Sequence, residues 1–151
     1  MRQRLAAYAV VADAVGRVLL TRHRPGRPGR WLLPGGGVEA GEHPEQAVVR
    51  EVLEEAGLAV AVIGPPFAVL SDVSRVGRRR RRLHTVRLIY RARPAGSGAA
   101  CEPARPGGQA GPERPGEAAR WCSPREWRAL PVAAFTASVL ERLDGGGQPA
   151  G

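Results

Sequence analysis

Apolar runs and turn residues alternate along the chain and predict a series of short strands joined by loops. A valine-rich apolar run predicts a buried strand at residues 5–12, and apolar residues resume at 17–21 after an Asp-Ala-Val-Gly turn. We expect these two strands to pair as a hairpin. The same pattern predicts further strands at residues 31–33, 59–63, 67–70, 83–92 and 120–122.

Helical periodicity is clearest at residues 44–57. Proline suits the first position of a helix, which Pro44 occupies, and Gly57 fits the left-handed cap at the other end. The apolar positions of this segment form one stripe that can pack on a sheet: Ala47, Val48, Val52 and Ala56. The spacing therefore predicts an amphipathic helix.

The remaining segments complete a single domain at residues 1–143, a length that allows one well-formed core. A short helix with a serine N-cap is predicted at residues 124–130, and a last helix at 133–143. Residues 93–116 are rich in Pro, Gly, Ala and Ser and are expected to form a flexible loop. Residues 144–151 are expected to be a disordered tail.

The N-terminal apolar run is interrupted by an aspartate and a turn, so neither a signal peptide nor a membrane span is predicted. Cys101 and Cys122 have neither metal-ligand spacing nor the density of a disulfide framework, which fits a reducing compartment. We therefore expect a soluble, cytoplasmic protein that does not bind membranes.

The chain has a formal net charge of +9, and all 23 of its basic residues are arginine. This charge favours polyanionic partners, either nucleotides or nucleic acid by non-specific attraction. Drift of composition on a solvated surface explains it equally well. The five arginines at residues 78–82 have no aromatics between them, which indicates an electrostatic funnel or a solvated hairpin tip rather than a base-stacking platform.

Three glutamates of the central helix define candidate chemistry. Glu51, Glu54 and Glu55 stand at positions i, i+3 and i+4, so their carboxylates share one helix face. Like charges at this spacing destabilise a helix unless a multivalent cation lies among them. The cluster is therefore a candidate metal site.

The residues around this cluster carry a resemblance to a known family. They occupy every defined position of the pattern G-x5-E-x7-R-E-U-x-E-E-x-G-U, where U is aliphatic: Gly36, Glu42, Arg50, Glu51, Val52, Glu54, Glu55, Gly57 and Leu58. The chain thus resembles the Nudix family, and its MutT-like members in particular. The similarity extends to the WLLPGG run before the pattern and to RWCSPREWRALP near the C-terminus.

The resemblance implies an α/β fold, an α/β/α sandwich around a mixed central sheet in which the pattern forms a loop, a helix and a loop. It also implies hydrolysis of a nucleoside diphosphate linked to another moiety, with Mg²⁺ or Mn²⁺ as cofactor. The chemistry agrees, because a divalent cation neutralises the pyrophosphate charge and activates the attacking water.

The resemblance also assigns roles within the helix. It makes Glu51 and Glu55 the principal metal ligands, and Glu54 a further ligand or the base that orients the water. Which glutamate acts as general base varies across the family and stays open. Arg50 is expected to pair with a carboxylate of the pattern and to hold its rotamer, so it is grouped with Glu51 and Glu54 as catalytic.

Positions around the helix receive supporting roles. Gly35 and Gly36 are expected to let the backbone approach the metal, with a carbonyl at Gly35 as a further ligand. Glu42 is expected to support the metal ligands from behind. Family members often add an acidic ligand from a late loop, for which Glu117 is the first candidate and Glu113 the second.

The sequence indicates the reaction more clearly than it indicates the substrate. Arg22 and His23 are candidates for contacts with the phosphates or base, and a solvated loop explains them equally well. Sequence marks of the ADP-ribose, diadenosine-tetraphosphate and NADH types are missing, and the chain has no asparagine to read oxidised guanine. We therefore expect a MutT-like hydrolase of nucleotides, for which a homodimer is possible. The alternatives are an RNA 5′-end pyrophosphohydrolase, with nucleic acid as a less favoured partner, and a non-catalytic nucleotide sensor.

Overall fold

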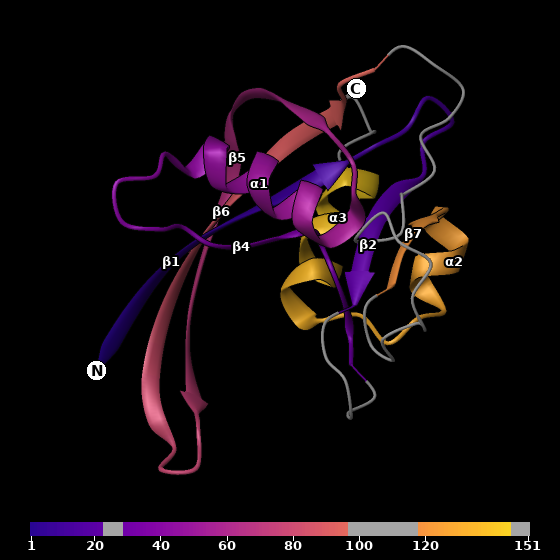
Figure 1. Cartoon of the computed structure of the whole chain (residues 1–151). Coiled ribbons are helices and arrows are strands. Elements are labelled where there is room, and N and C mark those ends of the chain that lie inside the picture. The colour runs from indigo at the N-terminus through magenta and orange to yellow at the C-terminus, as the bar shows by residue number, and fades with distance from the viewer. Residues whose placement is uncertain (23–28, 97–117, 146–151) are drawn as a thin grey trace, which may run out of the picture.

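The computed structural model describes residues 1–22, 29–96 and 118–145, which form strands and helices in the order shown in Figure 1. The elements are β1 (Arg2–Val11), β2 (Val18–Arg22), β3 (Trp31–Leu32), β4 (Gly35–Gly37), α1 (Pro44–Ala56), β5 (Val60–Val76), β6 (Arg81–Pro94), β7 (Ala118–Cys122), α2 (Pro124–Arg128) and α3 (Ala134–Gly145).

The strands form two sheets. A four-stranded sheet has the order β4-β1-β6-β5, in which β1 runs parallel to β6 and the other neighbours are antiparallel. A three-stranded antiparallel sheet has the order β3-β2-β7. The mixed character of the larger sheet confirms the predicted sheet type.

The core has two layers because side chains alternate along β1. Ala7, Ala9 and Val11 pack in one buried cluster with the apolar stripe of α1. Tyr8 and Val10 belong to a second cluster with residues of α2 and α3. Helices thus cover both faces of the sheet, which confirms the predicted α/β/α sandwich.

The predicted hairpin of the first two strands is wrong. β1 and β2 belong to different sheets and are joined by one isolated bridge, between Ala12 and Val18. The edges of β1 are already paired with β4 and β6, so β2 has no long edge to pair with. The turn itself is stabilised by Asp13, whose Oδ1 accepts hydrogen bonds from the backbone N–H groups of Val15 and Arg17.

Residues 35–37 and 64–66 also lie in strands, which the sequence pattern did not predict. The three glycines after Pro34 form β4 and pair with Ala6–Tyr8 of β1 instead of only ending a strand. The strands predicted on either side of residues 64–66 are one strand, β5, with a register shift between Ile63 and Ala68. Proline is tolerated there because β5 is the edge strand of its sheet.

β5 and β6 continue beyond β4 as a hairpin arm, residues 71–86, which Figure 1 shows reaching away from the helices. Its turn at residues 77–80 is closed by a hydrogen bond from the Arg80 N–H to the Gly77 carbonyl. The arginine run therefore lies at a hairpin tip, as one of the two explanations predicted.

The ends of the predicted flexible loop need correction. Arg93 and Pro94 belong to β6, and 97–117 lies outside the described residues. Likewise, α3 runs to Gly145, so the first two residues of the predicted tail are helical; residues 146–151 lie outside the described ranges.

The helix ends follow their sequence signals. α1 begins at Pro44 and ends at Ala56, and the following cap residue Gly57 has a left-handed φ of 62°, as predicted. Its N-cap is His43, whose ring nitrogen accepts a hydrogen bond from the backbone N–H of Glu45. Ser123 caps α2 as predicted, but α2 ends at Arg128 and not at residue 130. Within the described part of the chain, no helix is long and apolar enough to cross a membrane.

Candidate functional site

The glutamate face of α1 lies against the glycine strand β4. Four residues on the opposite face of the helix are buried in the core, so the glutamates lie off the apolar stripe, as predicted. Glu55 Oε2 accepts a hydrogen bond of 3.1 Å from the Thr21 hydroxyl and one of 3.3 Å from the Gly35 N–H. Strands β2 and β4, one from each sheet, therefore fix the position of the Glu55 carboxylate.

β4 must be built from glycine at two positions. The φ of Gly35 is +145°, and a Cβ there would lie 2.3 Å from the Ala7 carbonyl oxygen. A Cβ on Gly36 would lie 2.4 Å from Glu51 Oε1. Any larger residue would displace backbone or the Glu51 carboxylate, so glycine permits the close approach of β4 to β1 and to Glu51, while the predicted approach to a metal stays a prediction.

Arg50 links the loop before α1 to the glutamates. Its Nε and Nη2 donate to Glu42 Oε1 and Oε2 over 2.7 and 2.9 Å, a bidentate pair. Nη2 also donates to the Gly37 carbonyl, and Nη1 donates to Glu51 Oε1 over 3.1 Å. The predicted pairing of Arg50 with a carboxylate is therefore present, and it engages Glu42 and Glu51 together.

The electrostatics of the two paired carboxylates differ. Hydrogen bonds from Arg50 lower the pKa of Glu42 to about 2, so Glu42 is a carboxylate at neutral pH. Burial and the neighbouring charge of Glu55 raise the pKa of Glu51 above its usual value. Two nearby carboxylates in a partly desolvated place favour a bound cation, because it would relieve their mutual repulsion.

Glu54 differs from its neighbours because its side chain is 59% exposed, against 17% for Glu51. Its Oε2 lies 3.6 Å from Arg50 Nη1. The structure therefore brings Glu51 and Glu55 together at β4 and leaves Glu54 at the rim of the site.

The donor set suits a hard divalent cation. Among the described residues, no three His, Cys, Asp or Glu side chains already form a metal-binding group. Mg²⁺, however, is commonly held by one or two carboxylates together with substrate phosphates and water. Glu51 and Glu55 beside a glycine backbone fit that requirement. The predicted ligands Glu117 and Glu113 lie outside the described residues.

Tyr8 and Arg87 also border the site, although the sequence did not single them out. The ring of Tyr8 lies 4.9 Å from that of Phe135, and the Arg87 guanidinium lies 4.8 Å from the Phe135 ring centre. Burial raises the pKa of the Tyr8 hydroxyl, while Arg4 and Arg87 lower it and Glu55 raises it. The tyrosine within the apolar run of β1 is the sequence signal that could have identified Tyr8 as a residue beside the site.

Arg22 ends β2, and its guanidinium lies 5.5 Å from the ring centre of Trp31. Trp31 lies on the neighbouring strand β3, so this cation–π contact does not join Arg22 to the glutamates. His23 lies outside the described residues. Their predicted role as substrate contacts thus stays a prediction.

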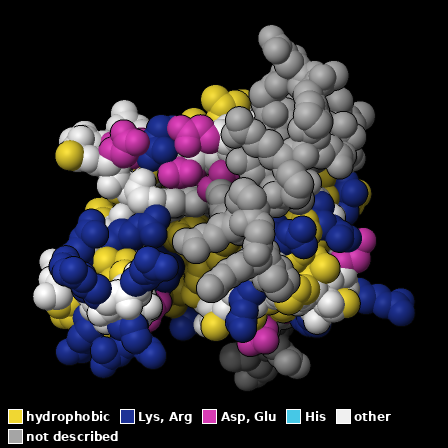
Figure 2. Space-filling view, turned by 60° about the horizontal axis from the view of Figure 1, so that its bottom comes forward, with side chains coloured by type: hydrophobic (Ala, Val, Ile, Leu, Met, Phe, Trp, Pro, Cys, Tyr) yellow, Lys and Arg dark blue, Asp and Glu magenta, His cyan; other side chains and the backbone are white. Residues whose placement is uncertain are grey.

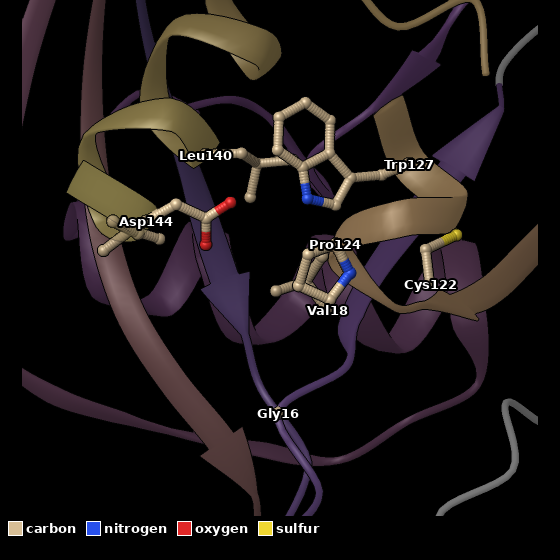
Figure 3. A pocket seen from close by; sticks show the side chains of 8 residues that line it. Gly16, Val18, Cys122, Pro124, Trp127, Leu140 and Asp144 are labelled. Atoms are coloured by element: carbon tan, nitrogen blue, oxygen red, sulfur yellow. The ribbon is translucent and has the colours of Figure 1, made fainter. Parts of the chain in front are cut away.

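A small hollow between the start of β2, α2 and α3 is a gap in packing (Figure 3). Val18, Trp127 and Leu140 contribute apolar walls, and Asp144 lies at its edge. Its volume of about 40 Å³ is far below the several hundred cubic ångströms of a small-molecule site. The hollow is therefore not a substrate site.

The fold and the carboxylate face together define an α/β/α domain in which an acidic helix is held against a glycine strand. The chain belongs to the Nudix family: the profile of the NUDIX domain matches residues 2–143. It is accordingly a hydrolase of pyrophosphate linkages.

Individual members of this family are similar to the chain. The chain is 30% identical to a MutT-like protein of Streptomyces ambofaciens over 95% of its own length and 79% of that protein. It is 36% identical to putative 8-oxo-dGTP diphosphatase 2 of Mycobacterium tuberculosis over 59% of its own length and 63% of that protein. Other curated relatives are also matched over less than two thirds of their length. The solved MutT Nudix hydrolase of Burkholderia pseudomallei superposes with a TM-score of 0.68 and 30% identity, over 95% of this chain and 99% of that one.

Proposed function

We propose that the chain is a MutT-like enzyme that hydrolyses the pyrophosphate linkage of a nucleotide with the help of Mg²⁺ or Mn²⁺. The observation that carries the proposal is the placement of Glu51 and Glu55 one helical turn apart beside the backbone of Gly35 and Gly36. These two carboxylates would hold the cation. When bound, the cation neutralises the phosphate charge and makes a water molecule a stronger nucleophile.

The chain's own residues hold this arrangement in place. Thr21 and the Gly35 N–H fix one oxygen of Glu55, and Arg50 fixes one oxygen of Glu51. Glu42 keeps Arg50 in position and stays ionised because its pKa is low. Such preorganisation matters because phosphoryl transfer to water depends mainly on positioning and charge stabilisation.

Glu54 is the residue we assign to orient the attacking water and accept its proton. It is exposed at the rim, and its Oε2 lies 3.6 Å from the Arg50 guanidinium. The roles of the three glutamates thus divide between holding the cation and handling the water.

The substrate class that we propose is a nucleoside triphosphate or a modified form of it. The names of the Streptomyces and Mycobacterium relatives support this choice. The Tyr8 ring, which packs against Phe135 and stands opposite Gly35, offers an aromatic surface for a base. Since the chain has no asparagine, oxidised guanine would have to be read by other groups.

A hydrolysis screen tests this function. Purified protein is incubated with dNTPs, oxidised dNTPs, ADP-ribose, nucleotide sugars and triphosphorylated RNA, with Mg²⁺ or with EDTA. We expect product from at least one nucleotide with Mg²⁺ and none with EDTA. Binding of a nucleotide without product across the panel would instead support the sensor alternative.

A further inference from the structure

The hairpin arm and the start of β1 carry a strong, uncompensated positive charge. Their exposed arginines are Arg2, Arg4, Arg75 and the five at residues 78–82. Within these same segments Asp72 is the one carboxylate, and it pairs with Arg87. Figure 2 shows the basic side chains gathered around the end of the arm, with acidic side chains on the same face of the molecule.

Three of these arginines form a row on one face of the sheet. Arg2 of β1 is level with Leu83 of β6, so Arg2, Arg4 and Arg81 point to the same side. Residues two apart on a strand are about 6.6 Å apart. Arg2 and Arg81, with Met1 and Arg82, line a hollow of about 450 Å³ at the outer end of this arginine row.

The inner end of the arginine row reaches the site of the glutamates. The Arg4 guanidinium lies over Gly37, where a Cβ would be 3.5 Å from its Nε, and the Gly37 carbonyl accepts a hydrogen bond from Arg50. Tyr8, the next residue on this face after Ala6, stands opposite Gly35, whose N–H donates to Glu55. From Arg2 to Tyr8 the row spans roughly 20 Å of strand.

Arg87, on the same face of β6, flanks Tyr8 at this inner end. Among the described side chains, its Nε is the buried polar atom without a hydrogen-bond partner. The row therefore has cationic groups at its outer end, along its length and beside Tyr8 at its inner end.

We propose that the arginine row binds the phosphate backbone of a single-stranded nucleic acid, with the end of the strand at the glutamate site. One narrow row of guanidinium groups matches one chain of phosphates in charge and form. Because aromatic residues do not separate the arginines, binding depends on phosphates, is indifferent to base sequence and weakens steeply with salt.

The position of the strand end rests on the proposed function, whereas binding along the row does not. The test therefore uses a fluorescein-labelled oligonucleotide of about 16 nucleotides with a 5′-hydroxyl, which has no pyrophosphate to cleave. If this oligonucleotide did not bind, only the proposed binding of nucleic acid by the arginine row would be contradicted. Failure of the hydrolysis screen would contradict the proposed function alone.

The variants are Arg2→Gln with Arg81→Gln, and Arg125→Gln with Arg142→Gln as a control. All four arginines are exposed and both pairs change the charge equally, but the control pair lies on α2 and α3. Fluorescence anisotropy gives the association constant between about 50 and 200 mM salt. Loss of two phosphate contacts should reduce the magnitude of the log–log salt slope by about 1.4.

Across that salt range the row variant should thus lose about sevenfold less affinity than wild type, while the control keeps the wild-type slope. Equal slopes for the two variants would overturn the proposal, since net charge alone would then explain binding. So would binding of wild type to phosphatidylserine vesicles without binding of the oligonucleotide, because the row would then serve a membrane surface.

Discussion

The α1 site and the hairpin arm are both clusters of like charges, but the protein treats them in opposite ways. At α1, Arg50, Thr21 and the Gly35 N–H hold the carboxylates of Glu42, Glu51 and Glu55. On the arm, the five arginines at residues 78–82 are all exposed. Hydrogen bonds hold the negative charges of the α1 site in place, whereas the positive charges of the arm lie in solvent.

This difference separates two uses of charge. Fixed carboxylates suit chemistry, which depends on atoms held in productive geometry. Solvated guanidinium groups suit long-range attraction of a polyanion, which tolerates loose geometry and is weakened by salt. Substitutions at α1 should therefore lower kcat strongly. Substitutions on the arm should leave the free energy of unfolding nearly unchanged.

The largest effect is expected for Glu55→Gln and Glu54→Gln. Each removes one charge from the site, and we expect kcat to fall by about a hundredfold or more. Glutamine at position 55 keeps an oxygen that accepts from Thr21 and Gly35, so the fold should persist. Steady-state kinetics and thermal unfolding measure the two properties. Glu141→Gln, on the exposed side of α3, is the matched control. Retained activity in both site variants would contradict the assignment of the site.

The next effect is expected for Gly36→Ala. Its Cβ would lie 2.4 Å from Glu51 Oε1, so the carboxylate must move. A misplacement of about 1 Å can cost roughly a hundredfold in rate, and we expect kcat to fall by about tenfold to a hundredfold. Gly96→Ala, where an added Cβ meets nothing within 4 Å, should keep wild-type kinetics. If the two alanine variants had the same kcat, close packing of β4 on Glu51 would be irrelevant to catalysis.

Arg50→Gln should destabilise the protein in a pH-dependent way. The folded protein lowers the pKa of Glu42 from 4.5 to about 2 through Arg50. A lowered carboxyl pKa stabilises the fold above the unfolded pKa, and this stabilisation is lost as pH falls through the folded pKa. The gap in free energy of unfolding between wild type and variant should therefore be largest near neutral pH and shrink between about pH 4.5 and 2. Urea unfolding at several pH values measures it, and a gap that widened toward acid pH would contradict the pair.

The smallest effect is expected for Arg79→Gln on the arm. Its side chain is exposed at the hairpin tip, so the free energy of unfolding should change by less than about 0.5 kcal/mol. Urea unfolding at neutral pH measures this change. A larger loss would show that the arm arginines also stabilise the fold, and the contrast with α1 would weaken.

The sequence predicted α1 well because its signals are local. Pro44, Gly57 and the apolar stripe lie within one segment, and each acts on the backbone or on one packed face. The glutamates off that stripe then follow from the helix period alone. The position of the carboxylate face can therefore be predicted from the order of residues in this one segment.

Other features depend on partners that are distant in sequence. The pairing of β1 with β6 removes the edge that a β1–β2 hairpin needs. Three glycines become a strand because β1 offers them an edge, and the prolines of β5 survive on an outer edge. The bidentate link from Arg50 to Glu42, and the approach of Arg4 and Tyr8 to the site, likewise come from tertiary packing. Local pattern carries no signal for such contacts.

Titration with Mn²⁺, followed by electron paramagnetic resonance, tests the central claim most directly. It reports the cation itself and needs no knowledge of the substrate. We predict that wild type binds Mn²⁺ and that the Glu51→Gln, Glu55→Gln double variant, folded by circular dichroism, loses this binding. Binding of Mn²⁺ by the double variant as tight as that of wild type would contradict the claim that these two carboxylates hold the cation.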